Sequence, residues 1–127
     1  MTNFLVKEQL KNYYDLEERT ENFAKKVRSF TKRLPRTVEN IDDIKQLNRA
    51  TGSVASNYIE ANESLSKKDF LYRLKVCRKE AKESRLFLRL IDTGDDVSLE
   101  EERGVLIQEA TELMKIFGSI ITKTEIK

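Results

Sequence analysis

The chain has 127 residues, of which 36% are charged; it contains 4 glycines and 1 proline, and its 24 basic and 22 acidic residues leave a net charge of +2. This length fits one domain, and the composition is typical of a helical protein, because helices favour Glu, Lys, Arg and Leu and disfavour Gly and Pro. The chain has no histidine and a single cysteine, Cys77, which excludes an intrachain disulfide and argues against a zinc site or a histidine base.

Other whole-chain features favour a binding or structural protein over a membrane protein or an enzyme. No apolar run approaches the roughly 20 residues that span a bilayer, and residues 1–15 lack the apolar region and cleavage site of a signal peptide. No glycine-rich nucleotide-binding motif or serine-hydrolase motif occurs. We therefore expect a soluble, cytoplasmic protein without a membrane partner, a cofactor, a metal or a catalytic residue.

Four segments show the apolar spacing of helices, at about residues 16–34, 41–62, 67–92 and 99–123. Turn residues such as DTGDDV at 92–97 separate them, and no segment shows a strand pattern. Long helices joined by short loops predict an all-α fold, an antiparallel up-down-up-down four-helix bundle that takes up residues 1–127 as a single domain. Residues 1–14 are expected to form an N-terminal arm, or a short helix, that docks on the bundle or on a neighbouring subunit.

The first two helices each have one apolar stripe. Asp15 and Glu18 have the spacing of a capping box at the start of the first helix, and Pro35 is expected to end it. In the second helix, Gly52 removes a side chain at a place where another backbone can come close. The expected core residues are Leu16, Phe23, Val27, Phe30 and Leu34, followed by Ile44, Leu47, Thr51, Val54 and Tyr58.

The third and fourth helices begin at recognisable caps. Ser66 with Asp69, and Ser98 with Glu101, have the spacing of an N-terminal cap. Because Cys77 lies in the core stripe, we expect a small buried apolar side chain rather than a reactive thiol. The expected core residues are Phe70, Leu74, Cys77, Ala81, Ser84, Leu88 and Ile91, followed by Leu99, Leu106, Ala110, Leu113, Phe117 and Ile120, with Ile107, Met114 and Ile121 widening the last stripe.

The third helix has two further faces when its residues are placed at 100° intervals. A basic row lies beside the core stripe and consists of Lys75, Arg78, Lys82, Arg85 and Arg89. An apolar outer face lies away from the core and consists of Tyr72, Val76, Phe87 and Leu90. One bundle cannot bury two opposed apolar faces of a helix, so a second subunit is the simplest explanation of the outer face. The alternative is a set of scattered surface residues.

Charge alternates from helix to helix. Residues 16–36 hold seven bases and three acids (+4), residues 39–63 two and five (−3), residues 67–92 nine and four (+5), and residues 95–112 one and seven (−6). Because the first and third helices of an up-down bundle are diagonal, basic and acidic helices would pair across every contact. Alternatively, the basic row of the third helix follows the phosphates of a nucleic acid. The sequence leaves both interpretations open.

The second helix has a polar face opposite its core stripe, formed by Arg49, Ser53, Ser56, Asn57 and Glu60. Small and amide side chains allow another backbone to approach and to form hydrogen bonds, whereas the simpler interpretation is a solvated face. The two serines have no base beside them, which argues against a nucleophile. Glu60 and Glu63 lie one turn apart without a histidine, which gives little support to a di-metal site.

Two adjacent segments resemble a known family. QLNRATGSVASNYIEA at 46–61 and SKKDFLYRLKVCRKEAKESRLFLRLI at 66–91 are similar to the bacterial four-helix-bundle family named after the protein encoded in 23S rRNA intervening sequences. Motif order, spacing and loop length agree over about residues 13–123. The resemblance implies an antiparallel four-helix bundle and a ring-shaped homopentamer. A related branch, the accessory variability determinant of diversity-generating retroelements, is a basic pentamer that binds nucleic acid. The family's recurrent polar residues fall on Arg49, Ser53, Asn57 and Glu60.

The sequence and the resemblance together predict a non-enzymatic homo-oligomer that binds RNA or DNA through basic surfaces of the first and third helices. The expected phosphate contacts are Lys75, Arg78, Lys82, Arg85 and Arg89, with Arg49 as a secondary contact. The expected subunit interface consists of Tyr72, Val76, Phe87, Leu90, Ser53, Asn57 and Glu60. The alternative is an adaptor that binds a protein partner and no nucleic acid, in which the basic rows pair with acidic neighbours.

Overall fold

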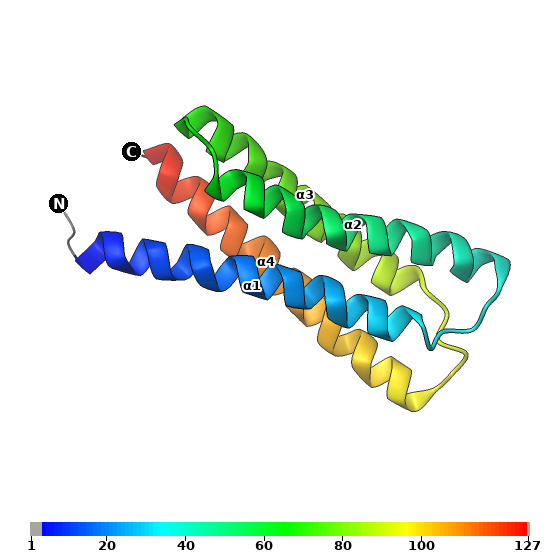
Figure 1. Cartoon of the computed structure of the whole chain (residues 1–127). Helices are drawn as coiled ribbons and strands as arrows, with labels where there is room; N and C mark the ends of the chain where they lie inside the picture. Colours follow the sequence, from blue (N-terminus) through cyan, green and yellow to red (C-terminus); the bar gives the residue numbers. More distant parts are fainter. Residues whose placement is uncertain (1–3, 127) are drawn as a thin grey trace.

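The computed structural model describes the backbone of residues 4–126 and the side chains of residues 16–126. Four helices follow one another along the chain: α1 (Phe4–Thr31), α2 (Val38–Asn62), α3 (Lys67–Leu90) and α4 (Val97–Ile126) (Figure 1). The part of the chain described here contains no strand. The predicted all-α fold is therefore confirmed.

The helices are arranged as a bundle in which each one packs on two others. The contacts join α1 to α2, α2 to α3, α3 to α4, and α1 to α4, and no contact joins α1 to α3 or α2 to α4 within residues 4–126. Short connections make sequential helices antiparallel neighbours. As a result, the two basic helices, α1 and α3, lie diagonally across the bundle, as expected for an up-down bundle.

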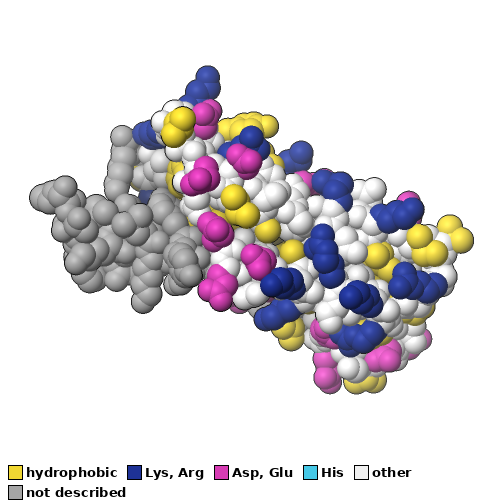
Figure 2. Space-filling model, in the orientation of Figure 1, with side chains coloured by type: hydrophobic (Ala, Val, Ile, Leu, Met, Phe, Trp, Pro, Cys, Tyr) yellow, Lys and Arg dark blue, Asp and Glu magenta, His cyan; other side chains and the backbone are white. Residues whose placement is uncertain are grey.

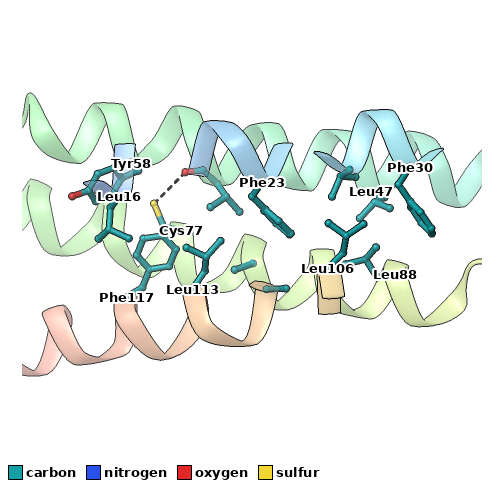
Figure 3. Close-up of a cluster of buried hydrophobic side chains, with 14 of the residues drawn as sticks. Leu16, Phe23, Phe30, Leu47, Tyr58, Cys77, Leu88, Leu106, Leu113 and Phe117 are labelled. Carbon is teal, nitrogen blue, oxygen red and sulfur yellow. Dashed lines mark hydrogen bonds between the residues drawn. The ribbon is translucent and has the colours of Figure 1, made fainter. Parts of the chain in front are cut away.

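The core consists of one stripe from each helix (Figure 3). The stripes predicted for the first and second helices are buried throughout, and Leu74, Cys77 and Leu88 of α3 are fully enclosed. Two predicted core positions differ: Phe70 and Ile120 are half-buried and pack against the core, while Ile121 is the buried isoleucine of α4. Cys77 donates a weak hydrogen bond from Sγ to the Val54 carbonyl oxygen at 3.6 Å, and burial raises the pKa of its thiol to about 12.

The first helix begins earlier than predicted. α1 starts at Phe4, so Asp15 lies inside a helix and the proposed capping box there is wrong. Residues 4–14 contain no Gly or Pro that would interrupt the helix. The expected arm is therefore part of α1 from Phe4 onward, and its first three residues and its side-chain docking lie outside the described residues. α1 ends at Thr31, and Leu34 completes a turn by donating from its backbone N–H to the Thr31 carbonyl at 3.3 Å.

The remaining helix starts show one confirmed cap and two corrections. Ser66 caps α3, because its side chain accepts the backbone N–H of Asp69 at 3.1 Å, as predicted. α2 starts at Val38 instead of Ile41, and its cap is Thr37. α4 starts at Val97, where the Asp96 carboxylate accepts the backbone N–H of Leu99 at 2.9 Å, so the predicted cap at Ser98 is wrong. An aspartate two residues earlier supplies the same hydrogen bond.

The contact at Gly52 involves a side chain and not a second backbone. Arg28 of α1 reaches across to α2 and donates from Nη2 to the Asn48 carbonyl at 3.2 Å and from Nη1 to Thr51 Oγ1 at 3.5 Å. A Cβ atom at Gly52 would lie 3.2 Å from Arg28 Nη2. Gly52 therefore makes room for the guanidinium that joins the two helices.

A buried asparagine joins the two loops at one end of the bundle. Asn40 is 1% exposed, and its Nδ2 donates to the carbonyl oxygens of Pro35 at 3.0 Å and Asp92 at 2.7 Å. Its Oδ1 accepts the backbone N–H of Asp92 at 3.0 Å. One side chain thus satisfies backbone groups in the α1–α2 loop and in the α3–α4 loop, and it fixes the position of α3's end relative to α2's start.

Replacing Asn40 with alanine should lower the free energy of unfolding by about 1–3 kcal/mol, because backbone groups of both loops lose the buried side chain that binds them. Urea denaturation followed by circular dichroism measures the loss. Asn22→Ala, at an exposed position of α1, is the matched control and should change stability by less than about 0.5 kcal/mol. Equal effects of the two substitutions would contradict this role of Asn40.

Candidate nucleic-acid interface

The basic row of α3 forms one exposed edge of the bundle. Lys75, Arg78, Lys82 and Arg89 are exposed, and Arg85 is half-buried. At a rise of about 1.5 Å per residue the row extends over roughly 21 Å. It lies on the side of α3 that faces α4, because Arg85 Nη1 donates to Thr111 Oγ1 at 3.3 Å. The structure thus brings the five predicted phosphate contacts together along one line.

Three residues of this row keep their charge available. Lys75 Nζ pairs with Glu125 Oε2 at 3.3 Å, and Arg85 is held by Thr111. Among residues 16–126, Arg78, Lys82 and Arg89 form no ion pair with a carboxylate. These three side chains are therefore the ones best placed to meet an external anion.

Ion pairs between helices account for part of the charge alternation. Arg19 of α1 pairs with Glu109 Oε1 of α4 at 2.7 Å, and Arg33, in the loop after α1, pairs with Glu102 Oε2 of α4 at 2.5 Å. Lys75 of α3 pairs with Glu125 of α4. Exposed pairs of this kind contribute about 0.2–1 kcal/mol each. The predicted pairing of basic helices with α4 is present, but it uses only some of the bases.

Arg19 is a bridge that the sequence analysis missed. It donates to both carboxylate oxygens of Glu109, from Nε at 2.8 Å and Nη2 at 2.7 Å, and also to Glu112 Oε1 at 2.9 Å. The pKa of Arg19 is raised, mainly by the hydrogen bond to Glu109. The bridge crosses an open groove of about 810 Å³ between α1 and α4. The sequence shows that Glu109 and Glu112 lie three residues apart on one helix face, but it does not indicate that Arg19 is their partner.

Arg49 lies in a different place from the basic row. It belongs to the α2–α3 contact, where Nη1 pairs with Glu80 Oε2 at 2.9 Å and Nη2 with Glu83 Oε2 at 3.6 Å. The Glu80 side chain is only 7% exposed, whereas that of Arg49 is 50% exposed. Here the base comes from the acidic helix and the acids from the basic helix. Arg49 therefore neutralises a buried carboxylate, and much of its charge is used inside the chain.

The polar residues expected at a subunit interface also contact α3. Asn57 Nδ2 donates to Ser53 Oγ at 3.0 Å, and Asn57 Oδ1 accepts from Arg73 Nη1 at 2.8 Å. Glu60 is exposed one turn further along α2. Arg49, Ser53 and Asn57 thus form, with α3, a polar seam within one chain. A second subunit meeting this face stays a prediction.

The pKa values of the two carboxylates at this polar seam, Glu80 and Glu83, are shifted in opposite directions. Burial disfavours a charged carboxylate, yet the pKa of Glu80 lies below its ordinary value. The hydrogen bond with Glu83 contributes most to the lowering, followed by those from Arg49 and Ser53. The pKa of Glu83 is raised by its hydrogen bond to Glu80, by burial and by the charge of Glu80. The stability due to Glu80 is therefore present above its ordinary pKa and lost as the pH falls through its lowered pKa, whereas that due to Glu83 has the opposite pH dependence.

The predicted apolar outer face of α3 is divided. Tyr72 and Leu90 are 61% and 56% exposed, whereas Val76 and Phe87 are half-buried and Phe87 packs against the core of its own chain. Leu86, which the sequence analysis left out, is 48% exposed and lies between the basic row and Leu90. Tyr72, Leu86 and Leu90 are therefore the side chains of α3 that a second subunit would cover.

A second basic surface lies over α1. In Figure 2, Lys and Arg side chains gather over the second half of α1 and the adjoining part of α2, and acidic side chains lie along the lower edge, where Figure 1 places the first turns of α4. Lys25, Lys32 and Arg36 are exposed, as is Lys45 of α2. Lys25 pairs with Glu21 at 3.0 Å within its own helix. This surface is separate from the basic row of α3.

The described residues contain neither a cluster of metal ligands nor a membrane-spanning helix. No three His, Cys, Asp or Glu side chains among them gather closely enough to hold a metal ion. None of the helices within residues 4–126 combines the length and apolar character needed to cross a membrane.

Replacing Arg49 with methionine should lower the free energy of unfolding at pH 7 by about 1–3 kcal/mol, because the buried Glu80 carboxylate loses its guanidinium. The loss should shrink at pH 4, because without Arg49 burial favours the protonated form of Glu80 in the variant, and a neutral carboxyl costs less to bury. Urea denaturation at the two pH values measures this. Arg49→Met/Glu80→Met should recover most of the stability. An equal loss at both pH values would show that the charge of Glu80 is not the cause.

Comparisons with known proteins agree with the fold. Residues 13–119 match the model of the 23S rRNA-intervening sequence protein family. A crystal structure of a protein of unknown function from the S23 ribosomal protein family of Bacteroides thetaiotaomicron is similar to this chain, with a TM-score of 0.72 and 27% sequence identity over 83% of this chain and 96% of that one. No curated protein matches the chain. The similar crystal structure supports the same fold. Because the family model covers most of its length, the chain belongs to the 23S rRNA-intervening sequence protein family.

Proposed function

We propose that this protein is a non-enzymatic homo-oligomer that binds RNA or DNA through the phosphate backbone, using the basic surfaces of α1 and α3. The observation that supports this best is the exposed row on α3, in which Arg78 and Lys82 lie about one turn apart, Arg89 lies two turns further on, and none of the three has a carboxylate partner among residues 16–126. Folding has used little of this charge, so it remains available to phosphates.

The proposal assigns no reaction to the protein. The thiol of Cys77 is enclosed in the core with a pKa of about 12, which leaves almost no thiolate at neutral pH. Ser53 and Ser84 form hydrogen bonds inside the bundle, Ser84 Oγ to the Glu80 carbonyl at 2.8 Å. Glu80, the buried acid, is neutralised by Arg49. These polar groups are thus engaged in contacts that stabilise the fold. This supports a binding role over a catalytic one.

Self-association is supported by the exposed apolar side chains of α3. Tyr72, Leu86 and Leu90 occupy the outer side of a helix whose inner side is already in the core. Leu86 and Leu90 lie about one turn apart, and adjoining exposed apolar side chains are typical of interaction surfaces, whereas Tyr72 lies about 21 Å away near the start of the helix. The homopentamer implied by the family resemblance gives these side chains a partner.

The competing proposal is an adaptor that binds a protein. It is favoured by Lys75 and Arg85, which contact Glu125 and Thr111 of the same chain and so stabilise the α3–α4 contact. In that case the basic row would stabilise the bundle and would make no contribution to RNA binding.

Replacing Arg78 and Lys82 with glutamine should weaken binding of duplex RNA and reduce the slope of log K against log salt by about 2, because each base that leaves a phosphate contact removes about one released counterion. Fluorescence anisotropy between 50 and 200 mM salt measures both. Lys68→Gln/Lys123→Gln, which removes the same charge from exposed positions outside the basic row, is the control. Wild-type protein that binds no RNA at 50 mM salt would favour the adaptor.

Replacing Tyr72 and Leu90 with glutamate should reduce the oligomer to monomers, because charges would be buried at the subunit contact. Light scattering of the purified protein measures the mass. Leu65→Glu/Val97→Glu, at positions 99% and 71% exposed outside the outer face of α3, should leave the mass unchanged. A wild-type protein that is itself monomeric would refute self-association.

A further inference from the structure

The two basic surfaces of the chain face away from each other. The α3 row consists of Lys75, Arg78, Lys82, Arg85 and Arg89, and the α1 patch consists of Lys25, Arg28, Lys32, Arg36 and Lys45. Because α1 and α3 are diagonal and make no contact within residues 4–126, neighbouring helices separate the two surfaces on both sides. Interhelical distances of 8–10 Å and helix diameters of 10–12 Å put the two faces on the order of 25 Å apart.

The α1 patch is built at the contact between α1 and α2. Arg28 anchors it, because its guanidinium lies on α2 at Gly52 and donates to the Asn48 carbonyl. Lys25 and Lys32 lie one turn to either side of Arg28 on α1. Lys45 lies one turn before Asn48 on the same edge of α2. All the side chains of the patch are exposed, so the basic groups form one surface that spans both helices.

Most of the charge in the α1 patch is available. Arg28 donates to a backbone carbonyl and a hydroxyl, which leaves its positive charge uncompensated. Lys25 pairs with Glu21, but Lys32, Arg36 and Lys45 form no ion pair with a carboxylate among residues 16–126. The α1 patch therefore resembles the α3 row in the property that supports phosphate binding.

Acidic helices lie between the two surfaces. Residues 39–63, which include most of α2, have a net charge of −3, and residues 95–112 of α4 have a net charge of −6. A nucleic acid that lies along one surface would have to pass an acidic helix to reach the other. Each surface is therefore suited to its own segment of phosphate backbone.

We infer that one chain holds two separate nucleic-acid segments, one on the α3 row and one on the α1 patch, and so bridges them. This rests on the proposed function, because both surfaces bind by the same phosphate contacts. Bridging raises the effective concentration of one segment near the other. The protein would thus bring two RNA or DNA segments together without reading their sequence.

The test uses the full-length protein and two unrelated duplex RNAs, one fixed to beads and the other fluorescent. The beads are saturated with protein and washed, and the captured fluorescent RNA is measured. Wild-type protein should capture it at 50 mM salt and release it at high salt. A parallel experiment with duplex DNA shows which nucleic acid is held.

Two charge-neutralising variants separate the surfaces. Lys32→Gln/Lys45→Gln weakens the α1 patch, and Arg78→Gln/Lys82→Gln weakens the α3 row. Each should still bind the fixed RNA, with affinity reduced less than about tenfold, but capture of the second RNA should fall more than tenfold. Lys68→Gln/Lys123→Gln, at exposed positions outside both surfaces, should capture the second RNA as the wild type does.

Three outcomes overturn the inference and differ in what they say about the proposed function. Wild-type protein that does not bind the fixed RNA refutes both the bridging inference and the proposed function. Binding of the fixed RNA without capture of the second refutes bridging alone. Full capture by Lys32→Gln/Lys45→Gln shows that copies of the α3 row in an oligomer do the bridging, and it refutes the α1 patch as a second surface.

Discussion

The short loops constrain this fold more than any single contact does. Residues 32–37, 63–66 and 91–96 are the only segments between helices within residues 4–126, and each returns the chain to the neighbouring position in the bundle. Sequential helices must then be antiparallel neighbours, and alternate helices must be diagonal. Asn40 makes this arrangement rigid at one end by joining two of the loops. The diagonal placement of α1 and α3 follows, and with it the separation of the two basic surfaces.

In the polar seam between α2 and α3, opposite charges are paired with each other, whereas most bases on the two outer surfaces face solvent. A buried Glu80 on a basic helix requires a base from its neighbour, and Arg49 is the residue that reaches it. Replacing such a pair by apolar residues need not destabilise a fold, so the seam is better understood as fixing the register of α2 on α3. Asn57 and Arg73 repeat the contact two turns away. This register also sets which residues of α3 remain outside, including Tyr72 and Leu90.

Apolar spacing predicted the bundle and nearly all of its core, because burial follows the helical period directly. Helix starts were less predictable. Ser66 is a cap, but Asp15 lies inside α1, because the helix continues back to Phe4. Ser98 is not a cap either, since Asp96 accepts the backbone N–H at the start of α4 instead. Within the candidate site, the line of bases on α3 was predictable from spacing along one helix. The partners of Arg19, Arg28 and Arg49 were not, because each pairing depends on how two helices are placed side by side.

A base that already holds a carboxylate contributes less to an external anion, because the field of the pair is largely cancelled at a distance. Arg19, Arg33 and Arg49 are in this class, and they lie in contacts between helices. Arg78, Lys82 and Lys45 hold no carboxylate among residues 16–126, and they lie on surfaces that face solvent. Each ion pair removes one base and one acid, so the net charge of +2 is unchanged by folding, and what matters to phosphates is where the unpaired bases gather. Folding neutralises bases inside the bundle and leaves those on two opposite edges, and it is this residual charge that supports nucleic-acid binding.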